Sequence, residues 1–419
     1  MSKATIILLA LIMGLGLGIV LDTRVHMLTE IADIVGTLWL NGLRMTVVPL
    51  VVALLVTGIA QTAAAARAGR LALRAVVTMM VILWASATMA AFVTPALLAS
   101  FPMPAEAGNA LKSALSTAPA TGEVKPFADF VRAIVPTNPI SAAANDAILP
   151  LIVFTMAFAF AILRLPEEKR TLIGGVFEAL GDAMLIVINW VLAIAPIGVF
   201  ALAYVVGAKA GAAALGALAH YVVIVSATGS VVWMSAFGLA VLGARRSPLT
   251  FFRAAIPAQA VAISTQSSLV SLPAMLRGVA SLGVPAATAD LVLPVAVAIF
   301  RATGPAMNMA VAIYVAHWMG VELSPRALAA GVAAAATTTL GAVSLPGTVS
   351  FVTSIAPISL AMGVPVEPLA LLIAVETFPD IMRTLGNVTM DMAVTATISE
   401  RAGDAAEDSP SPEPAKSAP

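Results

Sequence analysis

Five polar residues interrupt an apolar stretch near the C-terminal end of the chain and share one side of a helix. Their spacing of i, i+3, i+4, i+7 and i+11 places them on a single stripe, at about 100° per residue. They are Asp380, Arg383, Thr384, Asn387 and Asp391. We interpret the flanking segments, 368–377 and 392–398, as hydrophobic, which puts the stripe at membrane depth. A charge there costs roughly 2.5–3.5 kcal/mol on insertion scales, so the stripe is the first candidate for a binding site.

The side chains of this stripe suit a solute that carries two carboxylates and one amine. Arg383 is a permanent cation whose planar fork of donors fits a carboxylate, and Asn387 can donate to a second one. Asp380 can accept hydrogen bonds from an ammonium group. Asp391 lies one turn deeper, where a bare carboxylate suits a hard cation or a proton. In the simpler alternative, Asp380 and Arg383 form an intrahelical pair that only neutralises itself.

The composition is that of an all-α polytopic membrane protein. Hydrophobic residues make up 60% of the chain and charged residues 11%, with a mean hydropathy of +1.01, which no soluble fold matches. The zero net charge gives no basic surface for a nucleic-acid partner. Cysteine is absent and the three histidines lack metal-ligand spacing. We therefore expect a lipid bilayer around the chain and no resident cofactor.

Six apolar runs before residue 245 are long enough to span a membrane. They lie near residues 4–21, 35–60, 71–100, 144–164, 172–206 and 217–243. Basic residues cluster after the second, fourth and sixth runs, whereas the other connections are acidic or mixed. The positive-inside rule then places both termini in the cytoplasm, in a multi-pass protein of the inner membrane. We interpret the first run as a span and not as a signal peptide.

Beyond residue 245, two apolar stretches are broken at their middles by small and hydroxyl residues, at 264–268 and 337–347. Each half is too short to span, so each stretch is predicted to enter and leave the membrane as a helical hairpin. A spanning helix follows each hairpin, at 286–320 and 367–398, which makes an inverted repeat. Broken elements that meet near the midplane are typical of a transporter's binding site. The alternative is that the hydroxyl residues join tightly packed helices.

Two segments of this region carry a resemblance to a known family. Residues 380–391 read DIMRTLGNVTMD, close to the pattern D-x-x-R-T-x-x-N-V-x-x-D, and residues 264–277 read STQSSLVSLPAMLR. Shorter matches at 47–51, 148–154 and 195–201 extend the similarity over nearly the whole chain. The chain resembles the dicarboxylate/amino acid:cation symporters.

The resemblance implies eight transmembrane helices, two re-entrant helical hairpins and a homotrimer. One domain of each protomer in this family is thought to slide against a fixed scaffold, like an elevator. The implied divisions are scaffold helices in 1–70, a transport-domain helix in 71–100, an external loop with two scaffold helices in 101–216, and a transport core in 217–400. Residues 401–419 are expected to form a disordered cytoplasmic tail.

The resemblance also implies a role for each polar residue of the site. The substrate-binding residues would be Ser267, Ser268, Asp380, Arg383, Thr384 and Asn387. Asp380 would bind the substrate amine and Arg383 the side-chain carboxylate. Asn387 and Ser268 would bind the main-chain carboxylate, with Thr384 supporting the site. Ser267 adds donors at the tip of the first hairpin.

Two further sites follow from the resemblance. Asp391 takes the position of a carboxylate that binds sodium, with Asn387 beside it, and is the predicted metal or proton site. The tip of the second hairpin would form a gate. The gate residues are Ser344, Leu345, Pro346 and Gly347.

The chain departs from the family pattern at the centre of the seventh span. Where the family carries Asn-Met-Asp-Gly-Thr, residues 300–304 read Phe-Arg-Ala-Thr-Gly. Three hypotheses for coupling stay open: Arg301 replaces a bound cation, Asp391 carries a proton, or sodium is retained at one or two sites. In the mundane alternative, Arg301 extends toward water or pairs structurally.

We predict a secondary active transporter, not an enzyme, that moves an acidic amino acid with a cation. A channel would need pore-lining rings, which are not evident. An enzyme would need a dyad, but Asp380 and Asp391 are about 16 Å apart along their helix. The alternative within transport is a C4-dicarboxylate such as succinate, malate or fumarate, coupled to protons or with reduced sodium dependence.

Overall fold

The computed structural model describes residues 3–21, 26–67, 69–103, 134–145, 147–211, 213–341 and 347–407, and these residues are helical apart from short connections. In the first half of the chain the helices are α1 (Lys3–Leu21), α2 (His26–Arg44), α3 (Val47–Arg67), α4 (Arg70–Ser100), α7 (Pro139–Ala144), α8 (Ile148–Ile162), α9 (Glu167–Ala193) and α10 (Ala195–Ala210). In the second half they are α11 (Ala213–Leu242), α12 (Pro248–Thr265), α13 (Ser268–Ser281), α14 (Ala286–Ile299), α15 (Thr303–Met319), α16 (Pro325–Thr338), the 3-10 turn η2 (Thr339–Gly341), α17 (Gly347–Ala361), α18 (Leu369–Leu372) and α19 (Thr377–Glu407).

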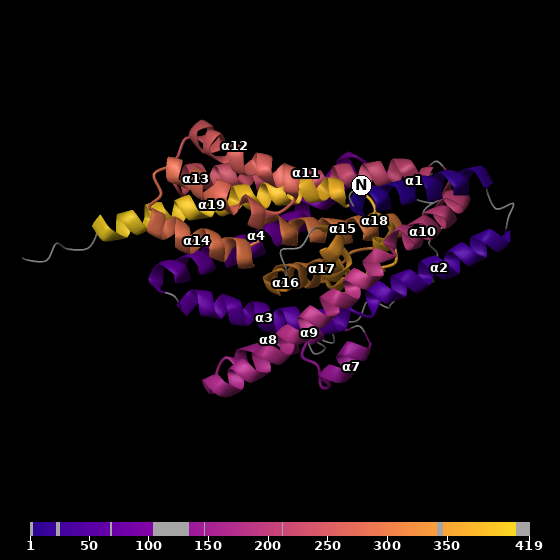
Figure 1. Ribbon diagram of the computed structural model, residues 1–419, viewed down its shortest axis with the longest axis horizontal. Helices are drawn as coiled ribbons and strands as arrows, with labels where there is room; N and C mark the ends of the chain where they lie inside the picture. Colours follow the sequence, from indigo (N-terminus) through magenta and orange to yellow (C-terminus); the bar gives the residue numbers. More distant parts are fainter. Residues whose placement is uncertain are drawn as a thin grey trace, which may run out of the picture.

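Helices that are far apart in the chain lie side by side (Figure 1). α1 packs along α10, and α3 packs against α8 and α9. α11 packs along α19, and α4 packs against α15 and α16 although it precedes them by some 200 residues. Gly14 and Gly18 allow the close approach of α1 to α10, because a Cβ at either position would overlap the α10 backbone.

Each predicted hairpin segment contains two helices that pack on each other. α12 and α13 pack on each other, as do α16 and α17. The first break lies at Gln266 and Ser267, inside the predicted segment 264–268. In the second hairpin α16 continues through η2 to Gly341, and residues 342–346 lie outside the described ranges.

Three predicted spans are interrupted, and each interruption lies just before a proline. The breaks separate α2 from α3, α9 from α10, and α14 from α15. Pro49, Pro196 and Pro305 follow them by a few residues. Proline has no backbone N–H to donate to the carbonyl oxygen four residues earlier, so that carbonyl is left without its helical partner. The predicted span at 286–320 is present as two helices, α14 and α15, with a break at residues 300–302.

The C-terminal helix also differs from its predicted bounds. α19 begins at Thr377 instead of 367, and the turn that precedes it contains α18. It continues to Glu407, so residues 401–407 of the predicted disordered tail are helical. Residues 408–419 lie outside the described ranges.

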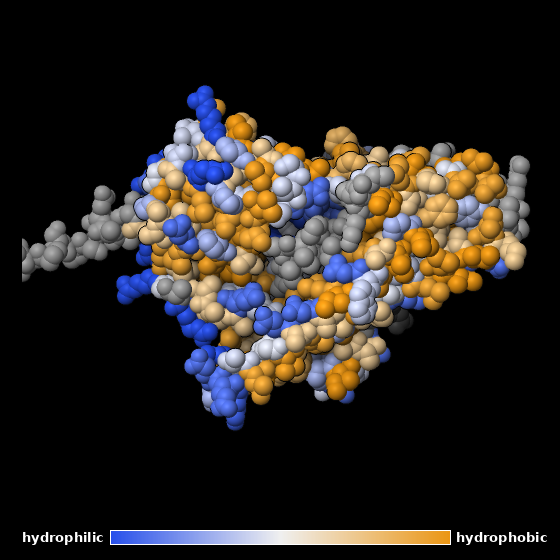
Figure 2. Space-filling view, in the orientation of Figure 1, coloured by the Kyte–Doolittle hydropathy of each residue, from blue (hydrophilic) through white to orange (hydrophobic). Residues whose placement is uncertain are grey.

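Apolar side chains cover most of the visible surface, and blue hydrophilic residues gather at one end (Figure 2). Phe92 on α4 is 73% exposed and Trp190 on α9 is 68% exposed. Five helical segments within the described ranges are long and apolar enough to cross a membrane: Met27–Arg67, Arg70–Ser100, Glu167–Ala193, Ala214–Leu242 and Ala286–Met319. Since exposed apolar surface on this scale is unfavourable in water, these faces are suited to lipid.

Candidate functional site

The stripe on α19 faces the break between α14 and α15. The backbone N–H of Thr303 donates to Asn387 Oδ1 at 2.9 Å. The Thr303 hydroxyl lies 2.7 Å from the same oxygen and 2.8 Å from the carbonyl oxygen of Arg383. The first N–H groups of a helix have no partner in their own helix, so Asn387 caps α15 from outside. Gly386 permits this approach, because a Cβ there would overlap the Thr303 side chain.

The tip of the first hairpin is fixed by two local interactions. Gln266 ends α12 in the left-handed conformation (φ 51°), and its amide donates to the carbonyl oxygen of Thr377 at 3.3 Å. Ser267 caps α13 by accepting from the N–H of Val270 at 3.3 Å. The Ser268 hydroxyl makes no hydrogen bond within the described residues, whereas the Ser267 hydroxyl is occupied by this cap.

Arg383 is held by partners on two other segments, α15 and the turn before α19. Its Nη2 donates to Glu376 Oε1 at 2.6 Å, and its Nη1 donates to Asn308 Oδ1 at 3.1 Å. The other oxygen of Glu376 accepts from the Tyr221 hydroxyl at 3.0 Å. Asp380 lies 3.8 Å from Arg383 Nε, which is too long for a hydrogen bond. The intrahelical pair considered from sequence is therefore the weaker contact, and Glu376 is the main counter-ion.

Arg301 and Asp391 have a different environment. Asp391 is fully buried, and neither carboxylate oxygen has a hydrogen-bond partner in the part of the chain that the structure describes. Arg301 acts on it electrostatically, without an ion pair within 4.0 Å among the described residues. No group of three or more His, Cys, Asp or Glu in the described ranges could hold a metal. A cation at Asp391 would therefore need other oxygens as its remaining ligands, from backbone carbonyls, amide or hydroxyl side chains, or water.

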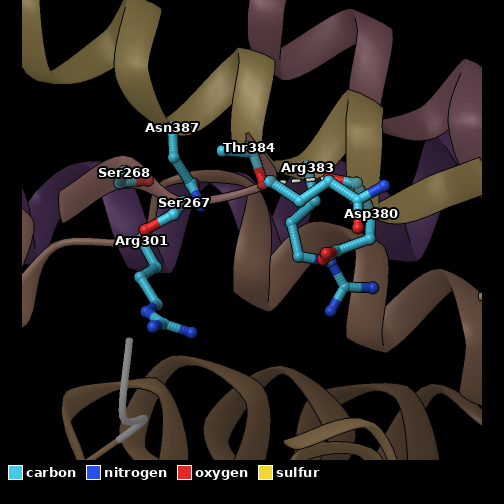
Figure 3. Close-up of a pocket in the computed structure, with 8 residues that line it drawn as sticks. Ser267, Ser268, Arg301, Asp380, Arg383, Thr384 and Asn387 are labelled. Atoms are coloured by element: carbon cyan, nitrogen blue, oxygen red, sulfur yellow. Dashed lines mark hydrogen bonds and ion pairs between the residues drawn. The ribbon is translucent and has the colours of Figure 1, made fainter. Parts of the chain in front are cut away.

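Eight residues from the first hairpin tip, the α14–α15 break and α19 line one small cavity (Figure 3). They are Gln266, Ser267, Ser268, Arg301, Asp380, Arg383, Thr384 and Asn387. All six predicted substrate-binding residues are among them, and the cavity also includes Arg301. Its volume of about 30 Å³ leaves room for roughly two water molecules.

A family model described as the sodium:dicarboxylate symporter family matches residues 4–401. The chain belongs to this family. Membership agrees with the resemblance found at residues 264–277 and 380–391. The protein that contains this cavity is therefore a transporter.

Several members of the family align with nearly the whole chain. The proton/glutamate-aspartate symporter of Escherichia coli (strain K12) is 29% identical over 405 residues, which cover 92% of this chain and 90% of that protein. The proton/sodium-glutamate symport protein of Bacillus subtilis (strain 168) is 29% identical over 393 residues, 92% of this chain and 89% of that protein. The C4-dicarboxylate transport protein 1 of Pseudomonas aeruginosa (strain UCBPP-PA14) is 24% identical over 405 residues, 94% of this chain and 87% of that protein.

Sequence reasoning missed four residues of this symporter's polar network. They are Tyr221, Thr303, Asn308 and Glu376. The interpretation of 368–377 as hydrophobic is wrong at Glu376, which is fully buried. This acid could have been found by extending the stripe backward, since Glu376 precedes Asp380 by four residues and Arg383 by seven. No comparable pattern pointed to Tyr221 or Asn308, which meet Glu376 and Arg383 only through tertiary packing.

The predicted gate stays a prediction. Ser344, Leu345 and Pro346 lie outside the described residues, and Gly347 is described only as the first residue of α17. Thr384 lines the cavity and donates to the carbonyl oxygen of Asp380 at 3.0 Å, within its own helix.

Proposed function

We propose that this symporter moves an acidic amino acid, aspartate or glutamate, together with a cation. The observation that carries the proposal is that Asp380, Arg383 and Asn387 line one cavity with the first hairpin tip. These side chains offer an acceptor for an amine and donors for two carboxylates. The names of the Escherichia coli and Bacillus subtilis relatives include glutamate.

Substrate binding on this proposal begins with a change of partner at Arg383. The cavity is too small for an amino acid while Arg383 donates to Glu376 and Asn308. The substrate's side-chain carboxylate would take the place of one of these acceptors, so that the guanidinium always keeps a partner. Glu376 is then a positioning residue that sets how easily Arg383 is released.

The charges of the site favour a co-transported cation. Three acids (Glu376, Asp380 and Asp391) face two arginines (Arg301 and Arg383), so the formal charge is −1 when all are ionised. An aspartate with net charge −1 makes the total −2. Uncompensated charge is costly at low dielectric, so a sodium ion or a proton should enter with the substrate. Asp391 is the place for it, because its buried oxygens have no hydrogen-bond partner among the described residues.

A C4-dicarboxylate is the second candidate substrate, because a relative in Pseudomonas aeruginosa is named for that transport. Succinate has no amine to donate to Asp380, so it would not use this acceptor on the cavity wall. The presence of this carboxylate among the lining residues therefore favours an amino acid.

The remaining features of the proposed transporter concern its assembly and movement. We infer a homotrimer with eight spans, both termini in the cytoplasm and the inner membrane as its location. The moving body would comprise 71–100 and 217–400, and the packing of α4 on α15 and α16 supports that grouping. Residues 344–347 would open and close the site.

Uptake into proteoliposomes tests the proposed function. Labelled aspartate and succinate are supplied under sodium, potassium or pH gradients, with wild type, Asp380→Ser and a matched surface variant, Asp290→Ser. We expect Asp380→Ser to lose aspartate affinity while succinate is unaffected, and Asp290→Ser to behave as wild type because Asp290 is exposed. Loss of succinate with aspartate retained would refute the role of Asp380. Transport that no cation gradient drives would refute symport.

A further inference from the structure

Arg301 differs from the other charged residues of the cavity in having no assigned partner. It lies in the non-helical break at residues 300–302, directly before α15. It is half-buried and lines the cavity. Within the described residues its guanidinium makes neither a hydrogen bond nor an ion pair, and the charged groups that act on it electrostatically are Asp380, Arg383 and Asp391.

An anion in the cavity would satisfy the charge and the hydrogen-bond donors of Arg301. Five N–H donors without partners beside a polar cavity leave most of their hydrogen-bonding capacity unused. Asp391 does not supply it, because that carboxylate has no contact with Arg301 at ion-pair distance and does not line the cavity. The mutual repulsion of Arg301 and Arg383 adds to the need for negative charge between them.

The placement of the two arginines fits an anion with two ends. Figure 3 shows Arg301 beside Ser267 and Asn387, and Arg383 beside Asp380, with both guanidinium groups below α19 in that view. Each guanidinium can take one carboxylate in a bidentate manner. The end near Arg301 also carries Ser268 and the amide of Asn387, whose oxygen is already used to cap α15.

We propose that Arg301 binds one carboxylate of the transported solute directly, so that the cavity holds a dicarboxylate between two guanidinium groups. This inference rests on the proposed function and adds to it a residue that determines specificity for the second carboxylate. For aspartate the carboxylate at Arg301 is the main-chain one, since Arg383 takes the side-chain carboxylate. Arg301 is then a ligand of the solute and not a substitute for a bound cation.

Binding titrations with paired ligands test this assignment. Purified wild type and Arg301→Gln are titrated with aspartate and with its two amides: asparagine, which lacks the side-chain carboxylate, and isoasparagine, which lacks the main-chain one. We expect Arg301→Gln to bind aspartate about 100-fold more weakly, as when one partner of a buried charge pair is removed. It should bind isoasparagine within about threefold of wild type, because that ligand has no carboxylate for Arg301. Arg253→Gln is the matched control, since Arg253 is exposed on α12.

Three results would overturn the proposal. Unchanged aspartate affinity in Arg301→Gln shows that Arg301 does not touch the solute. An equal loss for aspartate and isoasparagine shows a structural role. Recovery of aspartate affinity in Arg301→Gln on addition of sodium shows that Arg301 replaces a cation. If wild type itself binds neither aspartate nor succinate, the proposed function fails, which is distinct from all three.

A labelling experiment covers the case in which Arg301→Gln does not fold. The chain contains no cysteine, so Arg301→Cys introduces a single thiol. We expect saturating aspartate to slow modification of this thiol by a methanethiosulfonate reagent. Labelling with a cationic reagent should restore more aspartate binding than labelling with a neutral reagent of similar size. Arg253→Cys should be labelled at the same rate with and without aspartate. Absence of protection at Arg301→Cys would contradict direct contact.

Discussion

The two arginines that line the cavity of this symporter, Arg383 and Arg301, differ in whether the protein supplies acceptors for their guanidinium groups. Arg383 on α19 is buried and donates to Glu376 and Asn308, while Glu376 also accepts from Tyr221. Arg301, in the α14–α15 break, has no such partners in the described part of the chain, and there the carboxylate oxygens of the buried Asp391 have no hydrogen-bond partner either.

Arg383 has its hydrogen-bond acceptors on the protein itself, whereas, within the described residues, Arg301 and Asp391 can be paired only by a bound solute or cation. A buried charge with its own counter-ion stabilises one arrangement of the helices and must exchange partners before it can bind a solute. A buried charge without a partner raises the free energy of the empty protein, so it favours the state in which a solute or cation is bound. We therefore expect mutations at Arg383 to affect stability and binding together, and mutations at Asp391 to affect only cation dependence.

The largest effect should come from Arg383. Arg383→Met leaves Glu376 buried without its cation, which should cost about 3–5 kcal/mol of stability and abolish aspartate binding. The double variant Glu376→Met/Arg383→Met should recover most of the stability, because no charge is left unpaired, but none of the binding. Thermal unfolding in detergent and binding titrations measure the two quantities. Additive losses in the double variant would show that the two residues are not coupled.

Asp391→Asn should separate stability from cation binding. Replacing an unpaired buried carboxylate by a neutral amide should not lower the midpoint of thermal unfolding in sodium-free buffer. In wild type a cation at 100 times its dissociation constant should add about 2.7 kcal/mol of stability, and in Asp391→Asn this increase should be absent. Unfolding curves over sodium concentration and pH provide the measurement. A variant that is stabilised by cations as much as wild type would place the cation elsewhere.

Thr303 tests whether the α14–α15 break is held by α19. Thr303→Val keeps the shape of the side chain but removes the hydroxyl that contacts Asn387 and Arg383. Since Asn387 Oδ1 keeps the backbone N–H of Thr303 as a donor, the loss of the hydroxyl should cost about 0.5–1.5 kcal/mol, the net value of one hydrogen bond. Thr303→Ser, which retains the hydroxyl, is the matched control in the same thermal unfolding assay. Equal stability of the valine and serine variants would mean that the backbone N–H of Thr303 alone holds Asn387.

The smallest effect is expected at an ion pair outside the cavity. Arg44 and Glu367 are 2.5 Å apart, but their side chains are 37% and 20% exposed. Arg44→Ala should therefore cost only about 0.2–1 kcal/mol and leave aspartate binding unchanged. Unfolding midpoints measured at low and high salt would detect this loss of stability, which should be smaller at high salt because screening weakens exposed ion pairs. A loss as large as that of Arg383→Met would mean that the contact between α2 and the segment before α18 supports the whole fold.

Much of the site could be predicted from sequence because it lies on one helix. The i, i+3, i+4, i+7 spacing placed Asp380, Arg383, Thr384 and Asn387 on one side of α19, and all four line the cavity. The hydroxyl-rich break before residue 268 likewise predicted the first hairpin tip. Local periodicity suffices here, because a helix fixes the relative directions of residues three and four apart.

The partners of these residues were decided only by the tertiary structure. Glu376, Asn308 and Tyr221 come from three separate segments, and no sequence pattern measures the distance between helices that are far apart in the chain. The sequence by itself determined a helical membrane protein with a charged stripe and two broken hairpins, because hydropathy and helical spacing are local properties. Whether each buried charge finds a counter-ion depends on how the helices pack, and that packing gave Arg383 a partner on the protein and left Arg301 to face the cavity.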